Sequence, residues 1–117
     1  MGLGPVTDGA PGEGHTMAVL VIGEMPGGDA ALDARMMQEL GLQNAPAPGA
    51  MARFAGPTDT GWRVITVWES EDAYRTFERE RLMPMFQRLG ISRPSMQVSP
   101  LESVRIAPTA ATAQAAR

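Results

Sequence analysis

Residues 61–90 read GWRVITVWESEDAYRTFERERLMPMFQRLG, an apolar strand that runs directly into a capped helix. Side chains alternate between the two faces of a strand, and residues 62–69 carry large apolar groups on both. A four-stranded sheet that is backed by only two helices has one bare face. Apolar residues on both faces therefore predict a second covering layer, and a second copy of the chain would supply it.

The helix after this strand has a clear start and an expected interruption. Ser70 is a favourable N-cap, and Glu71 begins an acidic first turn at the positive end of the helix dipole. Pro84 has no N–H to donate, and its ring clashes with the preceding turn. We therefore expect the helix to kink or break near Leu82 and Met83.

Two further elements precede this stretch. Residues 17–23 (MAVLVIG) are wholly apolar, which is typical of a central strand that is buried on both faces. Asp29 then caps a short helix, and Gly41 ends it. The inward stripe of this helix, at helical spacing, consists of Leu32, Met36 and Leu40.

Two weaker strands complete the pattern. Residues 50–55 form a strand that residues 56–61 connect to the next one as a hairpin loop. A last strand begins near Ser95, and Pro100 within it predicts an edge position or a bulge, because a central strand needs that amide.

The order βαββαβ predicts an α+β, ferredoxin-like fold. It has a four-stranded antiparallel sheet, two helices on one face, and the first and third strands at the centre. We place the domain at residues 17–106, between a Gly/Pro-rich leader (residues 1–16) and an Ala-rich tail (residues 107–117). Both ends lack the apolar groups that repay ordering, so flexibility is expected there.

Composition excludes several classes of function. The net charge is −3 and the ten basic residues are all scattered arginines, which argues against nucleic-acid binding. There is no membrane-length apolar run and no signal-peptide pattern, so a cytoplasmic protein is expected. The chain has no cysteine or lysine, and its sole histidine, His15, lies in the leader. We therefore expect no metal site, no cofactor, and neither thiolate nor Schiff-base chemistry.

The run GWRVITVWES, followed by Tyr74, Phe77, Arg81-Leu82 and Pro84, resembles the dimeric α/β-barrel superfamily, in particular its antibiotic-biosynthesis monooxygenase-like members. The resemblance covers residues 17–106. It implies a homodimer whose sheets pack face to face, with a small-molecule pocket between sheet and helices in each subunit. Known roles include cofactor-free oxidation of polyphenolic polyketides, haem degradation, and cyclisation or isomerisation; some members have no assigned activity. Haem degradation requires an iron ligand, usually a histidine on a helix, and a histidine in the leader does not provide one.

Three residues of the strand-helix stretch are candidates for catalysis. Trp68 either caps the core against the helix or forms a platform for a flat ligand. Tyr74 is a proton donor if its phenol reaches a ligand, and a core residue otherwise. Arg81 lies on the inward stripe, where a buried guanidinium needs an anion or several carbonyls. Its partner is then Glu78, a carbonyl freed at the kink, or a ligand anion.

Arg53 and Arg63 lie on adjacent strands of the predicted hairpin. They pair with Glu69, Glu24 or carboxylates of a second copy, or else one of them faces the pocket and stabilises an enolate or peroxide. The chain has nine methionines, which suit either an adaptable pocket or core filling. The candidate ligand contacts are Met36, Leu40, Phe54, Thr66, Phe77 and Met85.

The leading hypothesis is a homodimeric, cofactor-independent tailoring enzyme, either a monooxygenase or a cyclase/isomerase, that acts on a flat and mostly apolar metabolite such as a polyketide intermediate. The alternative is a non-catalytic homodimer that binds a small ligand or serves as a stability partner. A third possibility is a filled interior, in which only the dimer surface has a role.

Overall fold

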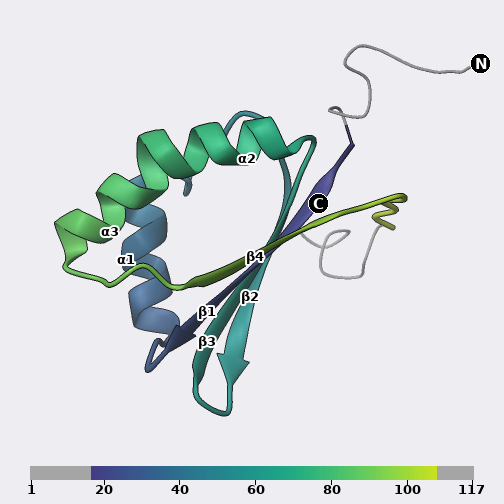
Figure 1. Ribbon diagram of the computed structural model, residues 1–117. Coiled ribbons are helices and arrows are strands. Elements are labelled where there is room, and N and C mark those ends of the chain that lie inside the picture. Colours follow the sequence, from purple (N-terminus) through teal and green to yellow (C-terminus); the bar gives the residue numbers. More distant parts are fainter. Residues whose placement is uncertain (1–16, 108–117) are drawn as a thin grey trace, which may run out of the picture.

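The computed structural model describes residues 17–107 as a four-stranded antiparallel sheet with helices on one face (Figure 1). The strand order is β2-β3-β1-β4, so the α+β ferredoxin-like prediction is confirmed. The elements are β1 (Val19–Pro26), α1 (Ala30–Leu40), β2 (Ala50–Thr58), β3 (Gly61–Trp68), α2 (Glu71–Phe77), the π-helical turn η2 (Glu78–Leu82), α3 (Met83–Leu89) and β4 (Ser95–Pro100). The predicted leader, and all of the predicted tail except Ala107, lie outside the described residues.

The two most apolar strands, β1 and β3, are central, as predicted, and pair along their whole length. β4 begins at Ser95 and forms one edge of the sheet, which accommodates Pro100. The first strand differs from the prediction in extent, because it continues past Gly23 to Pro26 and begins at Val19. Its last residue, Pro26, pairs with Gly61, the first residue of β3.

The hairpin is tighter than predicted. β2 continues through the expected loop to Thr58, so that Asp59 and Thr60 alone connect it to β3. Pro57 is tolerated within β2 because this strand is at the other edge of the sheet. Gly61 is required next to the turn, since a Cβ there would overlap the carbonyl of Met25.

The helix ends follow the predicted signals. Asp29 accepts a hydrogen bond from the amide of Leu32, and Ser70 accepts one from the amide of Ala73. Gly41 ends α1 in the left-handed region, with φ of 70°. The expected break before Pro84 takes the form of a π-helical turn, in which the amide of residue 83 donates to the carbonyl of residue 78.

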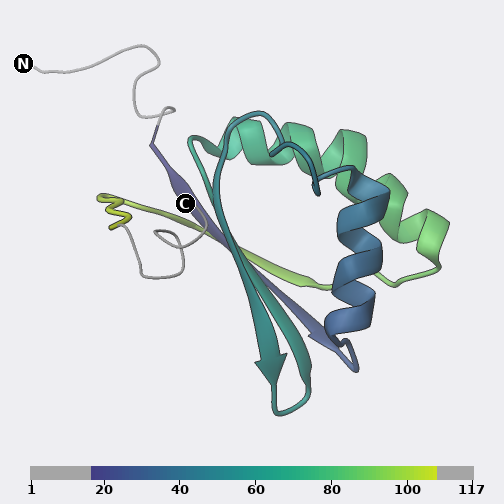
Figure 2. The ribbon, with the colours of Figure 1, turned by 180° about the vertical axis from the view of Figure 1, so that it is seen from behind.

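The core lies between the sheet and the helices (Figures 1 and 2). It is centred on Val21, Trp68, Tyr74, Met85 and Phe86, which are each at most 3% exposed. No helix within residues 17–107 has the length and apolar character needed to cross a membrane.

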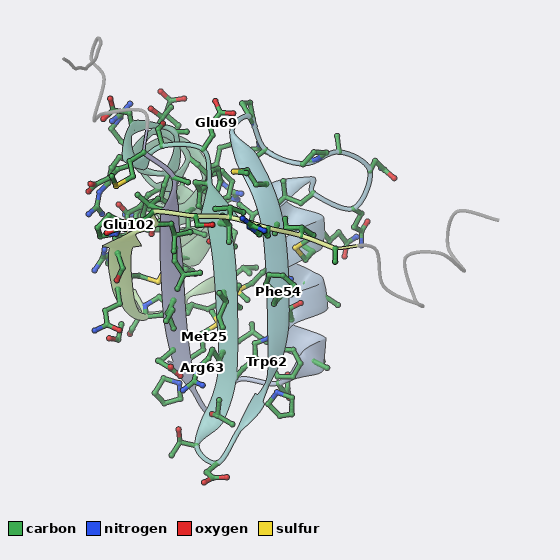
Figure 3. All side chains as sticks on the ribbon, turned by 90° about the vertical axis from the view of Figure 1, so that its right-hand side faces the viewer. Met25, Phe54, Trp62, Arg63, Glu69 and Glu102 are labelled. Carbon is green, nitrogen blue, oxygen red and sulfur yellow. The ribbon has the colours of Figure 1, made fainter. Side chains whose placement is uncertain are left out.

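The opposite face of the sheet carries no helix, and we call it the open face. Its side chains come from alternate positions of each strand and include Leu20, Ile22, Phe54, Ile65 and Val67. Phe54 is 57% exposed, whereas Val67 is buried. The segment that follows β4 crosses this face at one end, as Figure 3 shows, and the amide of Leu101 there donates to the carbonyl of Ala18.

Gly49, in the loop before β2, allows a steric test of the fold. Gly49 has φ of 85°, and a Cβ there would lie 2.6 Å from the Cβ of Ala73 at the start of α2. We expect Gly49→Ala to lower the free energy of unfolding by about 2 to 4 kcal/mol, since it combines left-handed strain with overlap. Urea denaturation measures this. The control is Gly56→Ala, where a Cβ would meet nothing within 4 Å. It should change stability by less than about 1 kcal/mol, and equal effects of the two variants would contradict the prediction.

Candidate functional site

A cavity of about 390 Å³ lies between the sheet and the helices. Ligand sites usually begin at about 300 Å³, so the interior is not filled, and the third possibility raised by the sequence is excluded. Its walls come from the inner face of the sheet, from α1, from the loop after α1, and from α2, η2 and α3. The residues that line it include Gly23, Met36, Leu40, Gln43, Asn44, Ala47, Arg53, Val64, Thr66, Trp68, Phe77, Leu82, Met85 and Phe86.

Methionine side chains form much of the wall. Six of them line the cavity, namely Met25, Met36, Met37, Met51, Met85 and Met96. Gly23 keeps the centre of the sheet hollow, because a Cβ there would lie 3.0 Å from the sulfur of Met96. Flexible thioethers adapt to the shape of a ligand, so this wall suits a large apolar guest.

Trp68 lines the cavity with its ring, but its N–H already has a partner. The side chain is 2% exposed and packs against the rings of Tyr74 and Phe77, with centroids 5.7 and 5.0 Å away. Its Nε1 donates to the hydroxyl of Thr66 at 2.9 Å. The Thr66 hydroxyl accepts this bond, and within residues 17–107 its own proton has no protein acceptor. A hydroxyl oriented in this way can donate to a ligand oxygen.

Arg53 also lines the cavity, directly opposite Thr66 across β2 and β3. Its two terminal nitrogens bind both oxygens of Asp33 on α1, at 2.5 and 3.2 Å. Trp62 donates to the same carboxylate at 3.1 Å. The expected partners Glu69 and Glu24 were therefore wrong for Arg53. The reason is a β-bulge between Ala50 and Ala52, which turns the following side chains over to the other face.

The same bulge places Phe54 on the open face, so this predicted ligand contact does not line the cavity (Figure 3). Arg63 lies on the open face as well (Figure 3). It pairs with Glu24 at 2.6 Å, one of its expected partners. Neither residue can contact a ligand in the cavity, because the sheet stands between them.

Tyr74 belongs to the core and Arg81 is half-buried beside it, and neither residue lines the cavity. The Tyr74 hydroxyl donates to Glu78 at 3.2 Å, and burial, followed by the negative charge of Glu78, raises the pKa of this phenol far above its usual value. Arg81 donates to the carbonyl of Leu40 and lies over the ring of Phe77. Of the partners expected for Arg81, the structure therefore gives a carbonyl, but from the end of α1 rather than from the kink. Since Leu40 and Phe77 both line the cavity, Arg81 positions two parts of its wall.

The sequence analysis missed Asp33, although a signal for it was present. Asp33 is three residues before Met36 and seven before Leu40, so it shares their inward stripe. An acidic residue on such a stripe needs a donor or a cation. The described residues contain no group of three His, Cys, Asp or Glu side chains that would hold a metal ion, and His15 lies outside them.

No family model and no curated protein matches the sequence. Solved structures do match. A protein of unknown function from Nitrosomonas europaea, NE2512, superposes with a TM-score of 0.56 at 22% identity, covering 80% of this chain and 97% of its own. SnoaB, a cofactor-independent oxygenase from Streptomyces nogalater, gives 0.50 at 16% identity, covering 80% and 99%. A monooxygenase from the gene ActVA-Orf6 of Streptomyces coelicolor, in complex with nanaomycin D, gives 0.50 at 17% identity, covering 82% and 96%.

The chain has the fold of these oxygenases. The resemblance inferred from residues 17–106 is thereby confirmed for the fold, including the sheet and the placement of the helices. At identities below about a quarter, shared architecture does not carry a reaction with it, so activity rests on the residues of the cavity.

The hydrogen bonds of Glu78 make the stability of the protein sensitive to acid. Glu78 accepts hydrogen bonds from Tyr74, Arg75 and Arg93 at 3.2, 3.1 and 2.8 Å. Burial alone would raise the pKa of Glu78, but the bonds from Arg93, Arg75 and Tyr74 outweigh it and hold the pKa below its usual value. A lowered pKa in the folded state stabilises the protein above the unfolded pKa, and this stabilisation disappears as the pH falls through the folded pKa.

We therefore expect Glu78→Gln to reduce the free energy of unfolding by about 1 to 3 kcal/mol at pH 7, and to differ less and less from the unmodified protein below about pH 4. Urea denaturation at several pH values measures this. Glu71→Gln is the matched control, because Glu71 contacts only Arg75 among these partners and is 55% exposed. A constant difference across the pH range for Glu78→Gln would contradict the prediction.

Proposed function

We propose that each subunit of a homodimer binds a flat, mostly apolar metabolite in this cavity, such as a polyketide intermediate, and oxidises it without a cofactor. The observation that carries the proposal is the cavity itself: about 390 Å³, walled by methionines and the ring of Trp68, with polar groups confined to a few places. We call the pair formed by Arg53 and Thr66 the polar corner. It adjoins the ring of Trp68, whose N–H donates to Thr66, and this arrangement suits a planar ligand with an oxygen atom at one edge.

The fold gives independent support. Two proteins with the same architecture are described as a cofactor-independent oxygenase and as a monooxygenase bound to nanaomycin D. Oxidation of an anthrone-like methylene matches the chemistry that this cavity can assist. The methylene loses a proton to form an enolate, which reacts with O₂. One oxygen atom becomes the new ketone, and the other leaves as water.

The residues of the polar corner have a defined part in that reaction. Negative charge develops on the substrate oxygen as the enolate forms, and the Thr66 hydroxyl and the remaining N–H groups of Arg53 can stabilise it. Among residues 17–107, Arg53 is the one ionisable residue that lines the cavity, so this part of the chain supplies no carboxylate or histidine base to the wall. The substrate must therefore lose its proton readily, as an anthrone or a hydroquinone does.

A second function is favoured by a specific observation. The donors predicted from the sequence have protein partners: Trp68 binds Thr66, Arg53 binds Asp33, and Tyr74 binds Glu78. Satisfied donors are what a non-catalytic protein that binds a small apolar ligand would have. Cyclisation or isomerisation of a bound intermediate would use the same positioning without consuming O₂.

Oxygen uptake separates these functions. With anthrone as the substrate, we expect oxygen uptake by the purified protein. We expect Thr66→Val to lower kcat/KM about tenfold, because a donor to the developing charge is lost. Thr76→Val, at an exposed position of α2, is the matched control and should change nothing. Binding of anthrone without uptake would favour the non-catalytic function, and absence of both would remove the proposal.

The homodimer is supported by the open face. Apolar side chains from three strands form its centre, and Phe54 is 57% exposed there. Burying about 600 Å² of such surface per subunit, at about 25 cal/mol per Å², would contribute on the order of 15 kcal/mol before association costs. The Glu24–Arg63 pair is neutral in sum, so it adds no net charge where two such faces meet about a two-fold axis.

We expect the protein to sediment as a dimer at micromolar concentration, and Phe54→Glu to sediment as a folded monomer because it places a charge in the apolar centre. Gln87→Glu adds the same charge on the exposed surface of α3 and should remain dimeric. Sedimentation velocity and circular dichroism measure association and fold. A monomeric unmodified protein would contradict the proposed dimer.

A further inference from the structure

The cavity contains a positive charge that the protein has already neutralised. Arg53 is the ionisable residue that residues 17–107 contribute to the wall, and Asp33 lies behind it on the first turn of α1, outside the set of residues that line the cavity. The two side chains meet end to end, with separate nitrogens on separate oxygens at 2.5 and 3.2 Å. Arg53 therefore faces the cavity as half of an ion pair.

Trp62 fixes this arrangement. Its Nε1 donates to the same Asp33 oxygen that binds Arg53, at 3.1 Å. The side chains of Arg53 and Asp33 are only 27% and 16% exposed, so water screens the pair weakly. A carboxylate held by three donors from two neighbouring strands cannot easily turn away from the guanidinium.

The neutralisation changes which ligands the cavity accepts. An unpaired guanidinium in an apolar cavity would attract a carboxylate or a phosphate. With Asp33 in place, a second carboxylate at Arg53 would lie next to a like charge and would also lose its hydration. A neutral carbonyl has neither cost, and it can accept from Thr66 directly opposite Arg53.

We propose that Asp33 determines the charge selectivity of the cavity. By holding the charge of Arg53, it makes the cavity prefer uncharged aromatic ligands that carry an acceptor oxygen, and it discriminates against the corresponding carboxylates. This inference rests on the proposed function, in that a flat aromatic molecule occupies the cavity. Asp33 acts through Arg53 and is a positioning residue.

A pair of probes that differ in charge alone tests this selectivity. Anthraquinone-2-carboxamide is neutral, whereas anthraquinone-2-carboxylate is an anion of nearly the same shape at pH 7. Isothermal titration calorimetry with the whole chain gives the Kd of each probe. We expect the unmodified protein to bind the carboxamide at least about tenfold more tightly, and Asp33→Asn to bring the ratio to one or reverse it.

Two control variants separate charge selectivity from stability. Asp33→Glu retains the carboxylate and should keep the preference for the carboxamide. Glu39→Gln removes another ion pair of α1, the 3.2 Å contact with Arg88, and should leave the ratio of the two Kd values unchanged. Thermal unfolding of each variant shows whether it is folded.

Each outcome decides the inference. If Asp33→Asn weakens both probes by the same factor, Asp33 is merely structural and the inference is overturned. If the unmodified protein binds both probes equally, the inference fails while the cavity remains a binding site. If it binds neither probe nor anthrone, the proposed function fails together with the inference.

Should Asp33→Asn not fold, Arg53→Met gives the second test. It leaves Asp33 as an unpaired anion beside the cavity, so the preference for the carboxamide should grow several-fold. An unchanged ratio of the two Kd values would show that the ion pair does not face the ligand and would overturn the inference.

Discussion

One extra residue in β2 governs the arrangement of the cavity. Across the bulge between Ala50 and Ala52, the inward and outward positions of the strand exchange. Beyond it, Arg53 faces the helices and Phe54 faces away from them. The bulge thereby brings the guanidinium within reach of Asp33 on α1 and adds an aromatic ring to the open face. The polar corner and the apolar patch on opposite sides of the sheet thus have a common cause in the backbone of an edge strand.

The interior combines an adaptable wall with a rigid polar corner. Six methionines line the space, while the polar side chains form two hydrogen-bonded pairs, Trp68 with Thr66 and Arg53 with Asp33. Such preorganised donors stabilise charge without having to rearrange, which favours catalysis when the charge develops on a bound substrate. The same satisfied network is equally stable with a passive ligand. The distinction between enzyme and binding protein therefore depends on the reactivity of the ligand, since the described residues of the wall supply no base.

Much of the fold could be predicted from local signals. Asp29, Ser70 and Gly41 act through the backbone of their own turn, so the helix ends were predicted from the residues alone. The central strands were evident from their apolar composition, and Pro100 identified an edge. The face of each residue in β2 could not be predicted, because a bulge is set by pairing with another strand. Tyr74 and Arg81 were assigned to the site from helical spacing, which does not show that their polar ends turn toward Glu78 and the end of α1.

The π-helical turn before Pro84 has a consequence for how this chain tolerates insertions and deletions. The wider turn accommodates one more residue than a regular helix does, and each residue corresponds to about 100° of rotation. Deleting one residue from Glu78–Leu82 would restore regular winding and leave the orientation of α3 nearly unchanged, whereas a further insertion would rotate α3 about its own axis by about 100°. After such an insertion, Pro84 and Met85 would take the places of Met85 and Phe86 at the cavity, and Phe86 would turn away from it. The number of residues between α2 and α3 thus determines which side chains of α3 line the cavity and can contact a ligand.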